Sequence, residues 1–256
     1  MQPQEQKKRP GLARFRWVIG TPYFVQGTST LVEVPILYFI KFTLGMGDAG
    51  GQLFDALRQS GWFIKPVWGI ISDRYPIFGY HRKSWYILMA CLATLFWLLN
   101  ALLAFIGITI PSVYLISFNL AFATYAFVDV VCDALMVTQG RKLKRVGNFI
   151  NFQWAVLAIA NAVSVYLGGW LQGQIQRNVY EPWLVFFVTA IPPLITAAVG
   201  IRYIDEERLP TKMRSRNRSS IRDKFSNAAH RALKRLWALP STVKKLRRNN
   251  RPLWLL

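Results

Sequence analysis

The sequence is poor in acidic residues, cysteine and histidine. Only 12 Asp and Glu stand against 32 Lys and Arg in 256 residues, so the formal net charge is +20. The two cysteines, Cys91 and Cys132, both fall in apolar runs and imply no disulfide framework. The two histidines, His81 and His230, lie in basic stretches and lack the spacing of metal ligands. No glycine-rich phosphate loop or catalytic constellation is present, so we expect no enzyme, no cofactor, no metal site and no direct ATP coupling.

Apolar and aromatic residues are abundant instead. Hydrophobic residues make up 53% of the chain, with 17 Phe and 10 Trp. A soluble domain of this size is rarely both so apolar and so basic. The first residues, "MQPQEQKKRPGLARFR", are short and polar and do not resemble a cleavable signal, and a plastid transit peptide would be longer and richer in Ser.

Six segments are long and apolar enough to cross a bilayer, which takes about 20 predominantly apolar residues. They are 17–40, 52–72, 84–108, 111–128, 149–171 and 183–201. The last four carry no charge, the first carries Glu33, and the second carries Asp55, Arg58 and Lys65. We therefore predict an all-α membrane protein with six transmembrane helices.

The basic residues give the predicted helices an orientation. On one side they number five in the N-terminal tail, three in 73–83, four in 140–148 and sixteen in 202–251. The connections on the opposite side, 41–51, 109–110 and 172–182, hold two. Because cytoplasmic connections are enriched in Lys and Arg, both termini are predicted to be cytoplasmic. The charge of +20 then reflects topology and attraction to anionic lipid headgroups, and we expect no nucleic-acid partner.

The predicted helices divide the chain into four parts. Residues 1–16 form a cytoplasmic tail, 17–204 the six-helix domain, 205–250 a basic cytoplasmic linker and 251–256 the start of a seventh span. Apolar residues recur at near-helical spacing from Ile221 to Trp237, which predicts an amphipathic helix at the membrane surface. This layout predicts a truncated chain, half of a duplicated transporter, whose partner is the missing half or a second copy.

The stretch "FIKPVWGIISDRYPIFGYHRKSWY", residues 63–86, interrupts two apolar runs with charge and turn residues. Lys65 lies about 10 Å inside the cytoplasmic end of the second span, so its ammonium must be paired, snorkel or line a watery cavity. Pro66 removes a backbone hydrogen bond and disfavours helical geometry at Lys65, which predicts a bend there. Gly69 is expected to allow close helix approach, and Gly79 to form a tight turn.

The polar residues of this stretch can be a generic cytoplasmic loop, but their spacing is more specific. They are Gly69, Asp73, Arg74, Gly79, Arg82 and Lys83. This pattern resembles the signature between helices two and three of the major facilitator superfamily. The fuller string, from Lys65 to Lys83, resembles the folate–biopterin transporter family within that superfamily. "YFVQG" at 23–27 and "DVVCDALMV", with Asp129 and Asp133, agree with it.

The resemblance covers about residues 17–204 and implies a fold and a function. Members have twelve helices, so this chain corresponds to an N-terminal half built from two inverted three-helix repeats. The implied activity is proton-coupled symport of folate or pterins, by rocking of two halves around a midplane site. Asp73 and Arg82 would latch the cytoplasmic gate. The chain departs from the family at Thr138, where a Glu is usual, which puts any coupling role of that Glu in doubt.

Asp129 and Asp133 lie one helical turn apart on one face of the fourth predicted helix. Two neighbouring carboxylates do not both ionise readily in a low dielectric, which suits a proton carrier. A carboxylate can also accept two parallel hydrogen bonds from the edge of a pterin ring. The third interpretation is a structural pair compensated by Lys65, Arg58 or Asn119.

Other polar residues fall inside the first two predicted helices. Glu33 is alone in the first, two residues before Pro35, which points to a pathway or a partner. Gln26 could bind an aromatic heterocycle or link helices. Asp55 and Arg58 are interpreted as a helix-end pair near the outer mouth.

Two alternative functions remain open at this stage. One is a facilitator for another organic anion. The other is a non-transporting six-helix remnant or scaffold whose basic tail binds lipid. A bacterial inner membrane, including a cyanobacterial one, is the favoured location, with a plastid membrane as the alternative.

Overall fold

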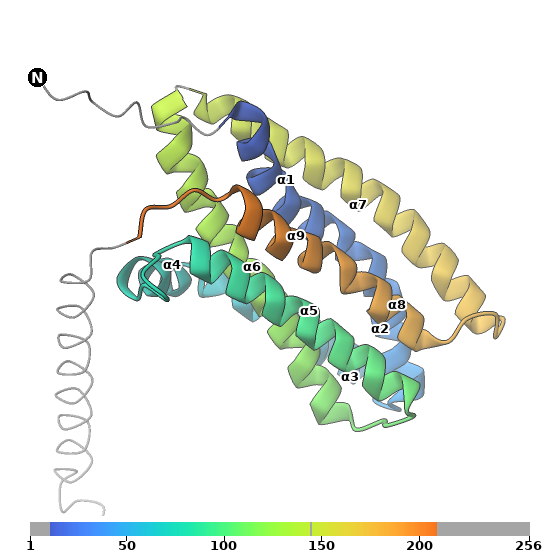
Figure 1. Ribbon diagram of the computed structural model, residues 1–256. Helices are drawn as coiled ribbons and strands as arrows, with labels where there is room; N and C mark the ends of the chain where they lie inside the picture. Colours follow the sequence, from blue (N-terminus) through green and yellow to red (C-terminus); the bar gives the residue numbers. More distant parts are fainter. Residues whose placement is uncertain (1–10, 144, 209–256) are drawn as a thin grey trace, which may run out of the picture. The chain divides into compact units, whose positions relative to one another are not determined.

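The computed structural model describes residues 11–143 and 145–208, and those up to Glu207 form an all-helical bundle (Figure 1). The helices are α1 (Leu12–Thr28), α2 (Thr30–Tyr38), the π-helix η1 (Phe39–Thr43), α3 (Gly47–Phe63), α4 (Lys65–Arg74), α5 (Lys83–Phe105), α6 (Pro111–Leu143), α7 (Val146–Gln176), α8 (Pro182–Thr189) and α9 (Ile191–Tyr203). The all-α membrane fold class is confirmed. The predicted linker, the amphipathic helix at its centre and the seventh span lie outside the described residues, apart from 205–208.

Four stretches among the described residues are long and apolar enough to cross a membrane. They are Lys83–Phe105, Pro111–Lys142, Val146–Gln176 and Pro182–Tyr203, the last combining α8 and α9. They coincide with the four uncharged segments of the sequence. The two charged segments form interrupted helices, α1–α2–η1 and α3–α4. The count of six spans therefore stays a prediction.

Several helices extend beyond their apolar segments. The fourth apolar segment ends at residue 128, whereas α6 includes Asp129 and Asp133, as predicted, and continues to Leu143, so most of the predicted 140–148 connection is helical. The first helix begins at Leu12, inside the predicted tail. Hydropathy marks the part of a helix that suits lipid, whereas backbone hydrogen bonding continues through Asp129 and Asp133, whose carboxylates find partners within the bundle.

The helices turn back at two ends of the bundle. We call the end with the 75–82 turn the inner end, which the predicted topology places in the cytoplasm, and the opposite one the outer end. At the outer end, Gly45 (φ 67°) and Gly47 (φ 61°) shape the turn between η1 and α3. There Lys41 lies 2.7 Å from the Asp48 carboxylate, and its hydrogen bond and charge lower the pKa of that exposed carboxyl.

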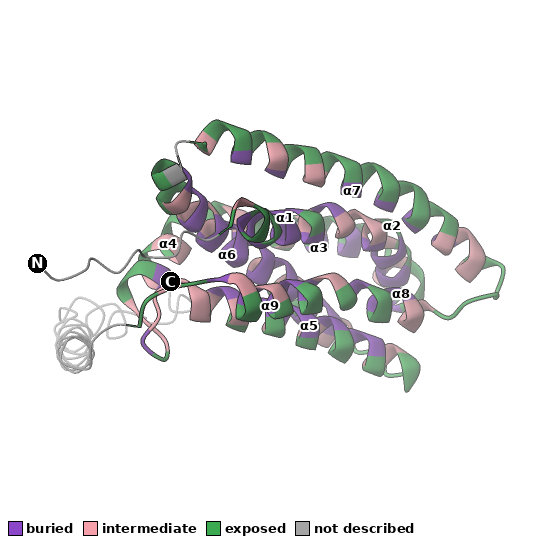
Figure 2. Ribbon diagram, turned by 45° about the horizontal axis from the view of Figure 1, so that its top comes forward, coloured by how far each residue is buried: buried purple, intermediate pink, exposed green. Residues whose placement is uncertain are grey.

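The core of the bundle surrounds α6. This helix packs against α5, α3, α1 and α4, and Figure 2 shows it mostly buried, whereas α7 is exposed along much of its length. Large apolar side chains cover the outside of α7, for example Ile159 (66% exposed) and Tyr166 (75% exposed). Such a surface suits contact with lipid or a further protein half, not water.

Glycines set the contact between the first helix and α7. A Cβ at Gly168 of α7 would lie 2.3 Å from the backbone oxygen of Leu31 in α2. One at Gly27 of α1 would lie 2.5 Å from the Cβ of Ala160. The backbones therefore approach more closely than any other residue allows. Gln26 lies next to Gly27 on α1, Gln153 lies about two turns before Ala160 on α7, and both side chains reach carboxylates of α6.

Candidate functional site

A buried polar network joins three helices inside the bundle. Lys65, at the start of α4, donates from Nζ to Oδ2 of Asp129 in α6 at 2.6 Å. Gln26 of α1 donates from Nε2 to the other oxygen of the same carboxylate at 2.7 Å. The Asp129 side chain is 3% exposed and that of Lys65 is 36% exposed. The ammonium also lies 4.4 Å from the ring centroid of Trp62. We call Gln26, Lys65 and Asp129 the central network.

Asp133 lies beside the central network but has different partners. Its Oδ1 accepts a hydrogen bond from the hydroxyl of Tyr23 at 2.9 Å and a longer one, 3.4 Å, from Nε2 of Gln153 in α7. Both donors are neutral, and no cation within the described residues forms an ion pair with Asp133. The two carboxylates of α6 are therefore unequal, because Asp129 is paired with a charge and Asp133 is not.

A helix break places Lys65 in the bundle. α3 ends at Phe63, Ile64 leaves helical geometry with φ −92° and ψ 13°, and α4 begins with Pro66 in its first turn. Proline is favoured at the start of a helix and tolerated poorly inside one. The indole of Trp68 donates to the backbone oxygen of Gly61 at 3.0 Å and satisfies a carbonyl near the break. The predicted bend is confirmed, with the break one residue before Lys65.

A second charged group lies nearer the outer end. Arg58 of α3 donates from Nη1 to Glu33 of α2, and its Nη2 lies 3.4 Å from Asp55. Its guanidinium carbon is 5.4 Å from the ring centroid of Phe122 in α6. Glu33, which is alone within its own predicted helix, was expected to mark a pathway or to have a partner, and the packing of α2 on α3 brings it to an arginine 25 residues away. The predicted contact between Asp55 and Arg58 is confirmed. We call Glu33, Asp55 and Arg58 the outer trio.

The turn at the inner end follows the expected chemistry. Ile77 and Tyr80 exchange two backbone hydrogen bonds across Phe78 (φ 52°) and Gly79 (φ 88°). Two positive φ values in succession are those of a type I′ turn, and glycine adopts such a value at no steric cost. Gly69 is different. A Cβ there would meet the Val130 side chain at 3.6 Å, an ordinary contact, so close helix approach does not require a glycine there.

Arg82 follows this turn and joins α4 to α6. Its Nη2 lies 3.5 Å from Oδ1 of Asp73, and its Nη1 donates to Oγ1 of Thr138 at 2.6 Å and to the backbone oxygen of Ala134 at 3.2 Å. Thr138 therefore receives the guanidinium as a neutral hydrogen-bond acceptor. Arg74 is exposed at the end of α4 and forms no ion pair with any described residue.

Glu206 holds the start of α5 and was missed by sequence reasoning. Its carboxylate accepts backbone N–H bonds from His81 at 3.1 Å, Arg82 at 3.1 Å and Lys83 at 2.7 Å. A carboxylate is stabilised there by unpaired amides and by the helix dipole. Lys83 in turn donates from Nζ to the backbone oxygen of Ile204 at 2.8 Å. The signal in the sequence was the acidic run at 205–207 in an otherwise basic region.

The central network and the outer trio lie along the same three helical segments. These segments are α1–α2–η1, α3–α4 and α6. The central network has one residue on each of them, whereas the outer trio lies on α2 and α3 and contacts α6 through Arg58 and Phe122. Phe122 and Asp129 are seven residues apart on α6, about 10 Å along its axis. Among the described residues, no group of three or more His, Cys, Asp or Glu side chains is placed to hold a metal ion. The arrangement places two carboxylates, whose oxygens accept hydrogen bonds, close to a single ammonium.

Comparisons of the sequence with known proteins give a family and several relatives. The BT1 family model matches residues 26–248. The chain is 32% identical over 187 residues to a folate-biopterin transporter of Synechocystis sp., covering 72% of this chain and 36% of that protein. It is 28% identical to the probable folate-biopterin transporter 4 of Arabidopsis thaliana (72% and 38%) and 27% identical to folate transporter 1 of Plasmodium falciparum (78% and 37%).

These relatives are longer than this chain, which spans between about a third and a half of the first three matched. No solved structure matches it. The eight curated relatives are all named as transporters, none as an enzyme. The family match, which covers most of the chain, and this identity together show that the chain belongs to the BT1 family.

Proposed function

We propose that this chain supplies the N-terminal six-helix half of a secondary transporter for folate or pterin compounds, built as in the major facilitator superfamily. The observation that carries the proposal is the central network. It holds a buried, charge-paired carboxylate where three helical segments meet. Polar networks inside a membrane bundle are costly and mark substrate or ion pathways. The relatives named as folate and folate-biopterin transporters supply the substrate class.

The central network is suited to hydrogen-bonding the edge of a pterin ring. A carboxylate accepts two parallel hydrogen bonds from an amino group and a neighbouring ring N–H. Both oxygens of Asp129 are occupied, by Gln26 and Lys65, so a substrate must displace one donor. The side chain of Lys65 is 36% exposed, and a released ammonium would meet the carboxylates of a folate. Binding and release thus exchange one charge-assisted bond for another.

Asp133 is proposed as the proton carrier. Its partners, Tyr23 and Gln153, are neutral, so no ion pair has to break when its carboxylate takes up a proton. Asp129 would have to give up its contact with Lys65 first. Proton transfer at Asp133 would also change the charge beside the central network, which couples it to substrate binding.

The two ends of the bundle would then act as gates. At the inner end, Asp73 and Arg82 join the turn to α6 through Thr138. Near the outer end, the outer trio joins α2 to α3. In a rocking mechanism such contacts hold one side closed while the other opens.

A chimera provides the test, in which this chain replaces the matching segment of the Synechocystis transporter. We expect vesicles containing the chimera to accumulate folate when a proton gradient is imposed. Asp129→Asn should lower uptake at least tenfold, and Asp133→Asn should abolish gradient-driven accumulation while exchange across the membrane survives. Asp205→Asn, at an exposed carboxylate, is the matched control and should behave as the unaltered chimera.

Uptake is measured per folded molecule, so that a loss of yield is not mistaken for a loss of activity. Normal uptake per molecule in both Asp129→Asn and Asp133→Asn would refute the functional assignment and favour a structural pair. Uptake of another organic anion in place of folate would refute the substrate class. If the chimera does not fold, folate binding to the purified chain must show the same loss in Asp129→Asn, or the proposal fails.

A further inference from the structure

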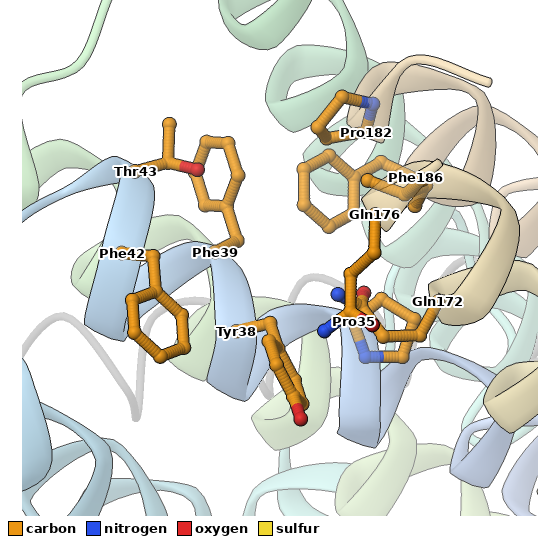
Figure 3. Close-up of a pocket in the computed structure, with 10 residues that line it drawn as sticks. Pro35, Tyr38, Phe39, Phe42, Thr43, Gln172, Gln176, Pro182 and Phe186 are labelled. Carbon is orange, nitrogen blue, oxygen red and sulfur yellow. The ribbon is translucent and has the colours of Figure 1, made fainter. Parts of the chain in front are cut away.

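A pocket of about 330 Å³ opens at the outer end of the bundle, away from the central network (Figure 3). It lies between α2 with η1, the end of α7 and the start of α8. None of its lining residues belongs to the central network or the outer trio. Those that matter here are Tyr38, Phe39, Phe42, Gln172, Gln176 and Phe186.

Aromatic rings form two of its walls. Phe39 and Phe186 are buried and meet edge to face, with centroids 5.3 Å apart and planes at 88°. Tyr38 and Phe42 lie 5.5 Å apart at the rim, where Phe42 is 74% exposed. A large exposed phenylalanine beside a preformed cavity offers a flat face to a ligand. The walls therefore favour a planar aromatic group.

Two amides line the third wall. Gln172 and Gln176 are one turn apart on α7, and Figure 3 shows both side chains extending from α7 towards α2. Gln172 is 7% exposed, and its side chain has no hydrogen-bond partner among the residues that the structure describes. Gln26 and Gln153, by contrast, both donate to carboxylates. The amide atoms of Gln172 are not among the buried polar atoms that lack a partner, so they remain accessible, and on the wall of the cavity their donor and acceptor are available to a bound group.

Of the described residues that line this pocket, none is charged. An ionised ligand group would be left there without a partner, whereas carboxamides both donate and accept hydrogen bonds. We infer that the pocket binds a planar, uncharged heteroaromatic ring whose edge carries donors and acceptors together. This inference rests on the proposed function: the ring is the pterin part of the substrate, held at the outer end apart from Asp129.

Pterin itself is fluorescent and uncharged near neutral pH, so it can be titrated directly against the purified 256-residue chain in lipid nanodiscs. Gln172→Leu keeps the size of the side chain and removes its polar edge, and should weaken pterin binding about tenfold. Gln176→Leu should weaken it less, since that side chain is more exposed. Gln174→Leu, on the same helix but outside the pocket, should leave the affinity unchanged.

A local reporter assigns the binding to this pocket. Thr43→Cys on the pocket wall, in a background of Cys91→Ser, should be protected from a thiol reagent by pterin, and Gln172→Leu should remove the protection. Protection should persist in Asp129→Asn. Equal affinity in Gln172→Leu and the parent, or no protection by pterin, would overturn the inference, and folate uptake by the chimera would still stand.

Two further results are decisive. Protection of Thr43→Cys that follows lipid chain length and not pterin would identify a lipid site and overturn the inference. Protection by pterin in a chain whose chimera moves no folate would refute the proposed transport and leave the ring-binding pocket in place.

Discussion

Replacing Lys65 by Met tests whether the central network holds the bundle together as well as binding substrate. The Nζ of Lys65 lies 2.6 Å from Oδ2 of Asp129, whose side chain is 3% exposed. Met keeps most of the aliphatic stem but removes the ammonium. The carboxylate is then left in the bundle with the Gln26 amide as its remaining donor. Either it stays ionised at a cost in stability or it takes up a proton.

The structure sets the size of the effect. Removing one partner of a buried ion pair costs about 3–5 kcal/mol, because the other charge is left unpaired. Lys65 is 36% exposed, so water partly compensates and we expect the lower end of that range. Loss of the ammonium from the face of Trp62 adds about 0.5–1 kcal/mol. A second change, Asp129→Asn, removes the stranded charge and should restore most of the loss.

Unfolding in detergent, followed by tryptophan fluorescence, gives the free energies for the parent, both single variants and the double variant. The double-mutant cycle should yield a coupling energy of about 2 kcal/mol between Lys65 and Asp129. Effects that add to within about 0.5 kcal/mol would mean that the two residues do not interact, and would refute the reasoning. The pair Lys41 and Asp48, at 2.7 Å, has an aspartate side chain that is 84% exposed, so it is the matched control and should show a coupling below about 1 kcal/mol.

Three further predictions concern packing, the inner turn and topology. Gly168→Ala should destabilise the bundle by about 2–3 kcal/mol, because its Cβ would clash with a backbone oxygen of α2. Gly169→Ala meets open space and should be neutral or stabilising. Tryptophan fluorescence during unfolding measures both variants. Thr138→Glu should raise the free energy of unfolding by about 0.5 kcal/mol, because the new carboxylate would pair with the Arg82 guanidinium that now donates to the Thr138 hydroxyl. The same fluorescence measurement checks this, and a loss of stability would contradict the geometry. In intact cells, a cysteine at position 177 should react with an impermeant thiol reagent and one at 145 should not; the reverse would end the topology model.

The sequence was most informative where a residue's own chemistry determines its place. Lys65 had to find a partner because an ammonium inside a span is costly, and the structure supplies Asp129. Pro66 predicted a break, and the helix stops at Phe63. Gly79 predicted a turn, and its φ is 88°. Each of these inferences needed a residue and its immediate neighbours in the chain.

Inference from the sequence failed where the partner lies far along the chain. The carboxylate of Glu33 meets an arginine 25 residues away, and Glu206 caps a helix that begins 123 residues earlier. Gln172 lines a pocket only because aromatic residues of α2, η1 and α8 pack beside it. Hydropathy and spacing contain no information on which faces of two helices meet. The apolar segment 111–128 is shorter than α6 for a related reason, since buried partners for Asp129 stabilise a polar stretch of helix.

In the proposed mechanism, the charges inside the bundle couple the opening of one end to the closure of the other. The outer trio has two carboxylates and one cation, and so do Asp129 and Asp133 with Lys65, which gives each group a formal charge of −1. Arg58 and Lys65 stand on either side of the break at Ile64, so a change of angle there moves the two cations differently relative to α6. Protonation of Asp133 brings the summed charge of Asp129, Asp133 and Lys65 to zero and leaves that of the outer trio unchanged. It thereby weakens the electrostatic attraction that holds Lys65. A motion about Ile64 that loosens Lys65 from Asp129 can therefore leave Arg58 on Glu33, so that one end opens while the other stays closed.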